Sequence, residues 1–196
     1  PKNSKLRVLS IGVVGTIGRA DRTQVAQHPA VEIAGLCDVD SNALAIAGKD
    51  HPKAFTCRDY REAFAKYGDQ FDAVIVSTPD HSHTPIMLTA MAHKKHVYGQ
   101  KPLVHQLEEL AMMEKAIAAR PELVTQVGNQ RMANAGRRAA VEILRQGMLG
   151  KAIEAHVWVN SPNERDYFNL DRMIGDPVPP PSNLDWNLWL CACEET

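Results

Sequence analysis

Short apolar segments alternate with helix-like segments along the first 128 residues, and this alternation is what most constrains the fold. The apolar segments predict strands at residues 6–11, 31–37, near 55, 71–77, 96–99 and 123–127. The segments between them predict helices at residues 19–28, 42–48, after 59, 85–93 and 106–119. Ser41 and Asp59 are the expected N-caps of two of these helices. Connections of about 2–6 residues favour a parallel sheet with helices on both faces, which is an α/β domain.

The pattern changes after Gly128. Residues 135–146 predict one more helix, and residues 151–159 alternate apolar and polar side chains as a strand with one solvated face does. A single strand cannot form a sheet or bury a core. We therefore expect residues 1–128 to form one domain and residues 129–196 to be the incomplete start of a second domain.

Composition narrows the class of protein. With 23% charged residues and a formal net charge of −1, the chain has no strong attraction to nucleic acid or to anionic membranes. Its apolar runs are far shorter than the roughly 20 residues of a membrane span. The cysteines have neither disulfide nor zinc spacing, and we expect Cys37 and Cys57 to be buried thiols. We expect a cytoplasmic protein, although a removed export signal would leave no trace.

A glycine-rich turn connects the first predicted strand to the first helix. Such a turn binds pyrophosphate because glycine lets the backbone approach and the helix N–H groups face the anion. In a G-x-G-x-x-G/A register, Gly15 and Ala20 take the outer positions and Ile17 occupies the middle one. A second register uses Gly12, Gly15 and Gly18. A tight turn with a purely structural role is the alternative to both.

Asp38 ends the second predicted strand, roughly 20 residues after the glycine turn. A carboxylate in that position accepts hydrogen bonds from the adenosine ribose hydroxyls, and it would repel a 2′-phosphate. The sequence therefore favours NAD over NADP as cofactor, while Arg19 leaves NADP open.

Residues 78–83 follow the most strongly apolar strand and so lie at the carboxyl edge of the sheet, where α/β proteins bind ligands. Their aspartate and histidines invite a metal interpretation, but no further ligand set completes a coordination sphere, and we predict no metal site. Turn and capping roles suit Asp80 and Ser82 better. For His83 two alternatives remain: a contact with a ligand, or an ordinary position at the start of a helix.

Lys101 follows the strand at residues 96–99 and precedes Pro102. The proline fixes the backbone and biases Lys101 to an extended conformation. A lysine at the carboxyl end of a strand can hydrogen-bond a substrate hydroxyl or help to move its proton. A solvated surface lysine is the alternative, and the residues alone do not separate the two.

Five segments, in their order along the chain, resemble the Gfo/Idh/MocA family: Ile11–Gly15, Cys37–Asp40, Ser77–His83, Lys95–Leu103 and Gly147–Lys151. The likeness runs from about Leu6 to Trp189, and the lysine-proline segment is its most specific part. It implies a Rossmann-like doubly wound parallel sheet, followed by the truncated start of an α+β substrate and oligomerisation domain. The full-length form is then expected to be a homo-oligomer.

The resemblance also assigns site residues. Lys101 inherits the catalytic lysine of the family's E-K-P motif, in which Gln100 replaces the usual glutamate. The resemblance and the residue patterns together give these expected cofactor-binding residues: Gly12, Gly15, Thr16, Ile17, Gly18, Asp38, Thr78, Pro79, His83, Gln100, Lys101, Gln130 and Arg131.

The implied activity is an NAD(P)-dependent oxidoreductase that transfers a hydride between nicotinamide and a small-molecule sugar, cyclitol or related polyol. Related branches use the same step to cleave glycosides, so an NAD-dependent glycosidase is an alternative. Two departures matter: Ile17 could crowd the pyrophosphate, and the family's later Asp/His pair would fall beyond Thr196. A non-catalytic dinucleotide-binding fragment without the substrate domain is therefore the competing class.

Overall fold

The computed structural model describes residues 5–130, 132, 134–158 and 178–194. The chain divides into two compact units: residues up to Asn129 together with those from Pro181 onward, and residues 130–180. The first limit lies next to the predicted boundary after residue 128. Residues 181–194, however, group with the first unit rather than with the residues before them. The second domain itself stays a prediction.

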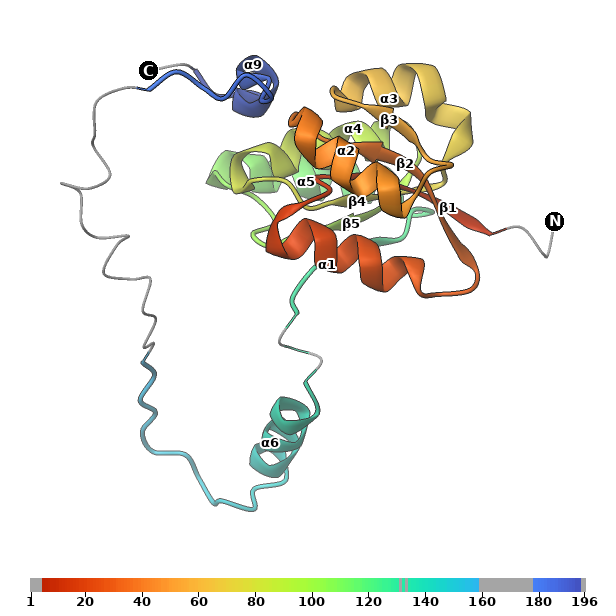
Figure 1. Cartoon of the computed structure of the whole chain (residues 1–196). Coiled ribbons are helices and arrows are strands. Elements are labelled where there is room, and N and C mark those ends of the chain that lie inside the picture. Colours follow the sequence, from red (N-terminus) through yellow and green to blue (C-terminus); the bar gives the residue numbers. More distant parts are fainter. Residues whose placement is uncertain (1–4, 131, 133, 159–177, 195–196) are drawn as a thin grey trace. The chain divides into compact units, whose positions relative to one another are not determined.

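A six-stranded sheet forms the centre of the first unit, with the strand order β3-β2-β1-β4-β5-β6 (Figure 1). Every neighbouring pair is parallel, which confirms the predicted parallel sheet. The chain reverses its direction of sheet growth between β1 and β4, which makes this the topological switch point. The strands are β1 (Leu6–Ile11), β2 (Val31–Cys37), β3 (Phe55–Cys57), β4 (Ala73–Val76), β5 (His96–Gly99) and β6 (Thr125–Val127).

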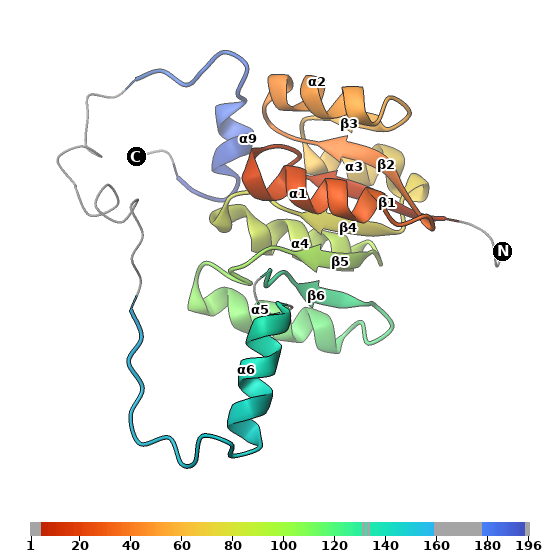
Figure 2. The same ribbon diagram turned by 60° about the horizontal axis from the view of Figure 1, so that its bottom comes forward.

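Helices cover both faces of this sheet (Figures 1 and 2). Alternate strand residues face opposite sides, so Val8 packs with Ala43 and Ala47, while Leu9 packs with the cluster that contains Phe64 and Met87. The helices are α1 (Gly15–Ala26), α2 (Ser41–Asp50), α3 (Tyr60–Tyr67), α4 (His83–Ala92), α5 (Leu107–Ala118) and α9 (Trp186–Leu190), with short 3-10 turns η1 (Gly68–Gln70) and η2 (Asp80–Ser82). No helix in the described part of the chain has the length and apolarity that crossing a membrane requires.

Helix starts differ from the sequence expectation in two places. Helix α1 begins at Gly15 rather than Arg19, because the glycine turn leads directly into its first turn. The N-cap of α2 is Asp40 rather than Ser41: its carboxylate accepts from the backbone N–H of Asn42 at 2.7 Å. An aspartate one residue earlier supplies the same capping chemistry, so sequence alone does not separate the two positions. Asp59 is confirmed as the N-cap of α3.

The second unit contains α6 (Ala135–Arg145), as predicted, with Asn134 as its N-cap. Residues 151–158 form no strand, so the strand predicted at residues 151–159 is wrong over its described part; Val159 lies outside the described residues. Ile153 and Val157 are 93% and 91% exposed. An alternating segment becomes a strand only when a neighbouring strand pairs with it, and none does so here among the described residues.

Candidate functional site

A cavity of about 410 Å³ lies over the carboxyl ends of β1, β2 and β4. This is the switch point of the sheet, where open α/β folds bind their ligands. The glycine turn, residues 38–40 after β2 and residues 77–79 after β4 form three of its walls. Leu184, Leu188 and Trp189 add a fourth wall from the end of the chain. The first unit alone supplies all of these residues.

The glycines of the turn each meet a different backbone demand. Gly12 has φ of 79°, and a Cβ there would lie 2.6 Å from the backbone carbon of Ser77. A Cβ on Gly18 would lie 2.4 Å from the carbonyl oxygen of Gly12, so Gly18 lets α1 pack closely on the turn. Gly15 has φ of 68° and open space around it at the cavity wall. The geometry favours the Gly12, Gly15 and Gly18 register, in which Ile17 is no glycine position.

The N-terminus of α1 opens at the cavity. Its N-cap residue is Val14, no side chain of the described residues caps it, and its first turn carries no acidic residue. The first backbone N–H groups of a helix have no partner within the helix, and the helix dipole makes this end positive. Such an end suits the pyrophosphate of a dinucleotide. Thr16 is an exposed residue of this first turn, and it lies outside the cavity wall.

Asp38 is held by the backbone on two sides. Its Oδ2 accepts from the N–H of Val13 at 2.9 Å, and its Oδ1 accepts from the N–H of Asp40 at 3.0 Å. Burial raises the pKa of Asp38 above its ordinary value, and these backbone hydrogen bonds oppose that rise. Each carboxylate oxygen keeps a further lone pair. Asp38 therefore remains able to accept ribose hydroxyls in the cavity that it lines.

The turn after β4 is fastened by Ser82. Its Oγ lies 2.8 Å from Thr78 Oγ1 and 2.9 Å from the Pro79 carbonyl oxygen. The carbonyl can only accept, so Ser82 donates to Pro79 and accepts from Thr78. Ser82 occupies the N-cap position of α4, as predicted, but its hydroxyl forms no capping bond. Thr78 and Pro79 thereby hold a fixed place on the cavity wall.

His83 is 1% exposed and joins two loops. Its Nε2 lies 2.8 Å from the carbonyl oxygen of Thr78, and its Nδ1 lies 2.9 Å from the carbonyl oxygen of Pro102. The ring thereby bridges the turn after β4 and the segment after β5, and a neutral imidazole, with one N–H, donates to one of the two carbonyl oxygens. His83 does not line the cavity, so its predicted cofactor contact stays a prediction.

Gln100 is buried behind the cavity, 3% exposed, and its Nε2 donates to Asp21 Oδ2 at 2.6 Å. Ser77 Oγ donates to the same oxygen at 2.8 Å. Sequence reasoning missed Asp21; its one signal is its position three residues after Gly18, on the helix face toward the sheet. Gln100 therefore positions the end of β5, and its predicted cofactor contact stays a prediction.

Lys101 is exposed just beyond β5, and its peptide bond to Pro102 is cis. Its backbone N–H donates to Gln100 Oε1 at 3.4 Å. Its ammonium makes no hydrogen bond or ion pair with any residue that the structure describes, and it lies outside the cavity wall. Gln130 belongs to the second unit, and Arg131 lies outside the described residues. Among the residues described, no cluster of histidine, cysteine or carboxylate side chains could hold a metal ion.

Cys37 and Cys57 are free and buried, as predicted. They occupy matched positions on the paired strands β2 and β3. The hydrogen bond with Cys57, followed by burial, raises the pKa of the Cys37 thiol well above its ordinary value. The two thiols therefore pack as small apolar side chains beneath Asp38.

Arg58 is a second residue that the sequence interpretation missed. It follows β3, and its guanidinium donates to the carbonyl oxygens of Val39 at 2.7 Å and Asn183 at 3.1 Å. Its place at a strand's carboxyl end was a usable signal. The contribution of residues 184–191 had no such signal, because a contact across about 140 positions leaves no local pattern in the sequence.

Residues 6–129 match the Gfo/Idh/MocA family, described as an oxidoreductase family with an NAD-binding Rossmann fold. An inositol 2-dehydrogenase from Pseudarthrobacter chlorophenolicus is 31% identical over 175 residues, which cover 88% of this chain and 51% of that protein. A glycosyl hydrolase family 109 protein from Shewanella woodyi is 32% identical over 116 residues, covering 56% of this chain and 25% of that one.

The crystal structure of a myo-inositol 2-dehydrogenase from Lactobacillus plantarum superposes with a TM-score of 0.70 at 28% identity, over 76% of this chain and 44% of that one. The chain spans about half the length of the inositol 2-dehydrogenases it matches. The family match extends over the whole sheet and over the glycine turn and Asp38 at its switch point. This chain therefore belongs to the Gfo/Idh/MocA oxidoreductase family, with an NAD-binding Rossmann fold.

Proposed function

We propose that this chain is the NAD-binding part of an enzyme that transfers a hydride between nicotinamide and a carbinol carbon of a sugar, cyclitol or related polyol. One observation carries the proposal: the uncapped start of α1, the open space at Gly15 and the carboxylate of Asp38 meet at one cavity at the switch point. Their donor and acceptor chemistry fits a pyrophosphate followed by a ribose. NAD, when bound, supplies the hydride chemistry.

The proposed contacts divide along the cavity. The start of α1 holds the pyrophosphate, Asp38 holds the adenosine ribose, and the turn at Thr78 and Pro79 holds the opposite half of the cofactor. The complete proposed set is Gly12, Gly15, Thr16, Ile17, Gly18, Asp38, Thr78, Pro79, His83, Gln100, Lys101, Gln130 and Arg131. Asp38 favours NAD because a 2′-phosphate would meet its charge.

We assign the proton-handling role to Lys101. Its exposed ammonium, without a protein partner among the described residues, is free to donate a hydrogen bond from Nζ to a substrate oxygen. When a carbonyl is reduced, the ammonium gives its proton to that oxygen, and when a hydroxyl is oxidised, the neutral amine takes the proton. Two neighbours fix its backbone: Gln100 is hydrogen-bonded to Asp21, and the carbonyl oxygen of Pro102 lies within hydrogen-bond distance of His83. A mobile side chain on a fixed backbone suits a group that must meet a substrate.

The substrate class rests on the relatives. Two of those described above are named inositol 2-dehydrogenases, which favours a cyclitol or polyol. The glycosyl hydrolase family 109 relative, at 32% identity, favours a second candidate, an NAD-dependent glycosidase. Both candidates place Lys101 beside a sugar-like ring, and they differ in whether NADH accumulates.

The test is an assay of NADH absorbance with NAD and a panel of inositols and monosaccharides. It uses this chain and a version extended to the length of the relatives. The proposal predicts NADH formation by the extended version with at least one polyol. Release of nitrophenol from a nitrophenyl glycoside without net NADH would favour the glycosidase. NAD binding with neither reaction in either version would contradict the enzyme assignment and leave a dinucleotide-binding module.

A further inference from the structure

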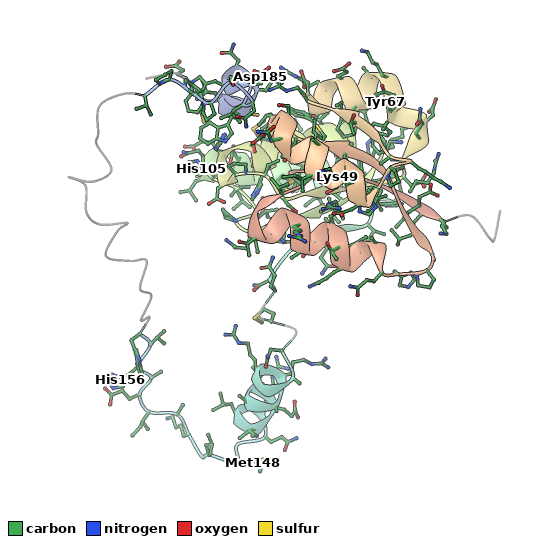
Figure 3. All side chains as sticks on the ribbon, in the orientation of Figure 1. Lys49, Tyr67, His105, Met148, His156 and Asp185 are labelled. Carbon is green, nitrogen blue, oxygen red and sulfur yellow. The ribbon has the colours of Figure 1, made fainter. Side chains whose placement is uncertain are left out.

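Residues 181–194 lie at the end of the sheet where α1 and α2 begin (Figure 2). They contain α9, whose N-cap Asp185 accepts from the N–H of Leu188 at 3.1 Å; Asp185 is labelled in Figure 3. The segment follows a long stretch of chain and then returns to the first unit. A return of this kind needs specific contacts to hold it, and the described residues show them at both of its ends.

The first end is fastened directly after Asp38. Asn183 Nδ2 donates to Asp40 Oδ1 at 2.8 Å, and the carbonyl oxygen of Asn183 accepts from the N–H of Ser41 at 3.0 Å. The N–H of Asp185 donates to the carbonyl oxygen of Val39 at 3.0 Å, and Leu184 forms an isolated antiparallel bridge with Asp40. The hydrogen bond from Asn183 is the main reason that the pKa of Asp40 lies below its ordinary value.

The second end is fastened to the turn after β4. His81 Nε2 lies 2.7 Å from the carbonyl oxygen of Trp189, and the two rings lie 4.9 Å apart. The Trp189 ring also stacks on Trp186, with centroids 4.8 Å apart and an interplanar angle of 7°. The segment thus spans the crevice from the loop after β2 to the loop after β4. Both loops are the ones to which the proposed function assigns cofactor contacts.

Between its two fastened ends, the segment presents apolar side chains to the cavity. Leu184, Leu188 and Trp189 line the cavity on this side, and Val39 in the loop after β2 and Ile86 in α4 line it from the Rossmann region. Along a dinucleotide, the order is pyrophosphate, ribose and then base. The part of the cavity beyond Asp38, away from the glycine turn, is therefore where the base of the adenosine would lie.

We propose that residues 181–194 are an adenosine clamp: Leu184, Leu188 and Trp189 close the base-binding half of the cofactor cavity over a flat, apolar purine. This inference rests on the proposed NAD binding and adds to it a wall that the Rossmann sheet does not supply. A purine ring suits this half because its faces are apolar and the clamp residues that line the cavity are uncharged. The charged side chains of Asp40 and Arg58 also line the cavity, and both are hydrogen-bonded to Asn183 of the segment. The proposal assigns no residue of the clamp to the nicotinamide itself.

The test measures the dissociation constants of NAD, ADP-ribose and nicotinamide mononucleotide by calorimetry. The protein is the full chain, and Leu188→Ala and Leu184→Ala are two cavity-wall variants. Leu190→Ala is the matched control, because Leu190 belongs to the same helix but does not line the cavity. Circular dichroism checks that each variant is folded.

The clamp predicts that each cavity-wall variant raises the dissociation constants of NAD and ADP-ribose at least tenfold. It predicts that the affinity for nicotinamide mononucleotide changes less than threefold, and that Leu190→Ala stays within threefold for all three ligands. Unchanged ADP-ribose binding in both wall variants would overturn the clamp, and so would tighter binding, which would mean that the segment obstructs the cavity. A wild-type chain that binds neither NAD nor ADP-ribose would instead refute the proposed function.

A second readout is independent of leucine truncation. The protein has three tryptophans, and Trp158 belongs to the second unit. In a Trp158→Phe variant, the clamp predicts that ADP-ribose still changes the tryptophan emission, because Trp189 lines the cavity. Loss of the whole ligand-induced change in this variant would contradict the clamp.

Discussion

Lys101 differs from the residues around it in its exposure. Gln100, the residue before it, is 3% exposed and hydrogen-bonded to Asp21, whereas the ammonium of Lys101 lies outside the packed structure. The resemblance to the family singled out Lys101 for its role. The contacts that position its neighbours were invisible in the sequence, because Asp21 meets Gln100 and His83 meets Pro102 only after folding.

We expect Lys101→Ala to abolish turnover in the version extended to the length of the relatives, because the substrate oxygen loses its proton partner. The dissociation constant of NAD should change by less than tenfold, which is at most ~1.4 kcal/mol, because Lys101 lies outside the cavity wall and is only one of the proposed cofactor contacts. Calorimetry and NADH absorbance measure the two effects. Lys49→Ala, an exposed lysine of α2 labelled in Figure 3, should change neither value. Equal activity in Lys101→Ala and the wild type would refute the assigned role.

Gln100→Glu tests the pairing with Asp21. The substitution places a second carboxylate within hydrogen-bond distance of Asp21 Oδ2, and two buried like charges repel. We expect the free energy of unfolding to fall by about 1–3 kcal/mol at neutral pH. The loss should shrink in acid, because the introduced carboxyl group, once protonated, can again donate to Asp21.

Asp21→Asn in the same chain is the matched rescue, since its amide can donate to the introduced carboxylate. Urea unfolding of the single and double variants measures the coupling. If Asp21→Asn makes the Gln100→Glu chain less stable still, then the hydrogen bond with Asp21 is not the reason that glutamine stabilises the fold at position 100.

At the scale of elements, the sheet and its helices were predictable because hydrophobic periodicity is local. All six strands and the five helices of the Rossmann region lie where the sequence placed them, to within a few residues at their ends. The failure at residues 151–158 has a physical cause, since an alternating segment forms a strand only beside a partner. The sequence placed the start of α1 at Arg19 instead of Gly15, because the last residues of the glycine turn are also the first residues of the helix.

Gly18→Ala tests the packing of α1 on the turn. A Cβ there would lie 2.4 Å from the carbonyl oxygen of Gly12, and backbone on both sides leaves little room to shift. We expect a loss of about 1–3 kcal/mol in the free energy of unfolding and weakened NAD binding. Gly48→Ala is the control: a Cβ on Gly48 in α2 has no neighbour within 4 Å. It should be neutral or stabilise by up to about 1 kcal/mol. Equal stability of the two variants would contradict the close packing.

The ion pair between Arg7 and Asp72 joins β1 to the start of β4. Arg7 Nη2 lies 2.6 Å from Asp72 Oδ1, and the hydrogen bonding between these side chains is the main reason that the pKa of Asp72 lies below its ordinary value. A lowered carboxyl pKa stabilises the fold above the ordinary pKa, and this stabilisation is lost as the pH falls through the lowered value.

Asp72→Asn should therefore lower the urea midpoint at neutral pH, and the difference from the wild type should vanish in strong acid. Glu114→Gln, an exposed carboxylate of α5, controls for the change in net charge. A constant difference between Asp72→Asn and the wild type at all pH values would show that the ion pair does not cause the effect.

At the scale of the whole molecule, the chain combines one unit with a complete parallel sheet and a second unit of which α6 is the described helix. Ile153, Val157 and Trp158 of the second unit are 93%, 91% and 74% exposed. Apolar side chains exposed to this degree favour association, which is consistent with the expected homo-oligomer of the full-length form. The homo-oligomer itself stays a prediction. The cavity at the switch point, in contrast, is lined entirely by residues of the first unit.

The most direct measurement is a calorimetric titration of this chain with NAD and with NADP, for the wild type and for Asp38→Ala. We predict saturable binding of NAD at one site and at least tenfold weaker binding of NADP, which corresponds to about 1.4 kcal/mol or more. Asp38→Ala should raise the dissociation constant of NAD and reduce the difference between the dissociation constants of NAD and NADP. No detectable NAD binding to a folded wild-type chain, or equally tight NADP binding, would contradict the assignment of the cavity.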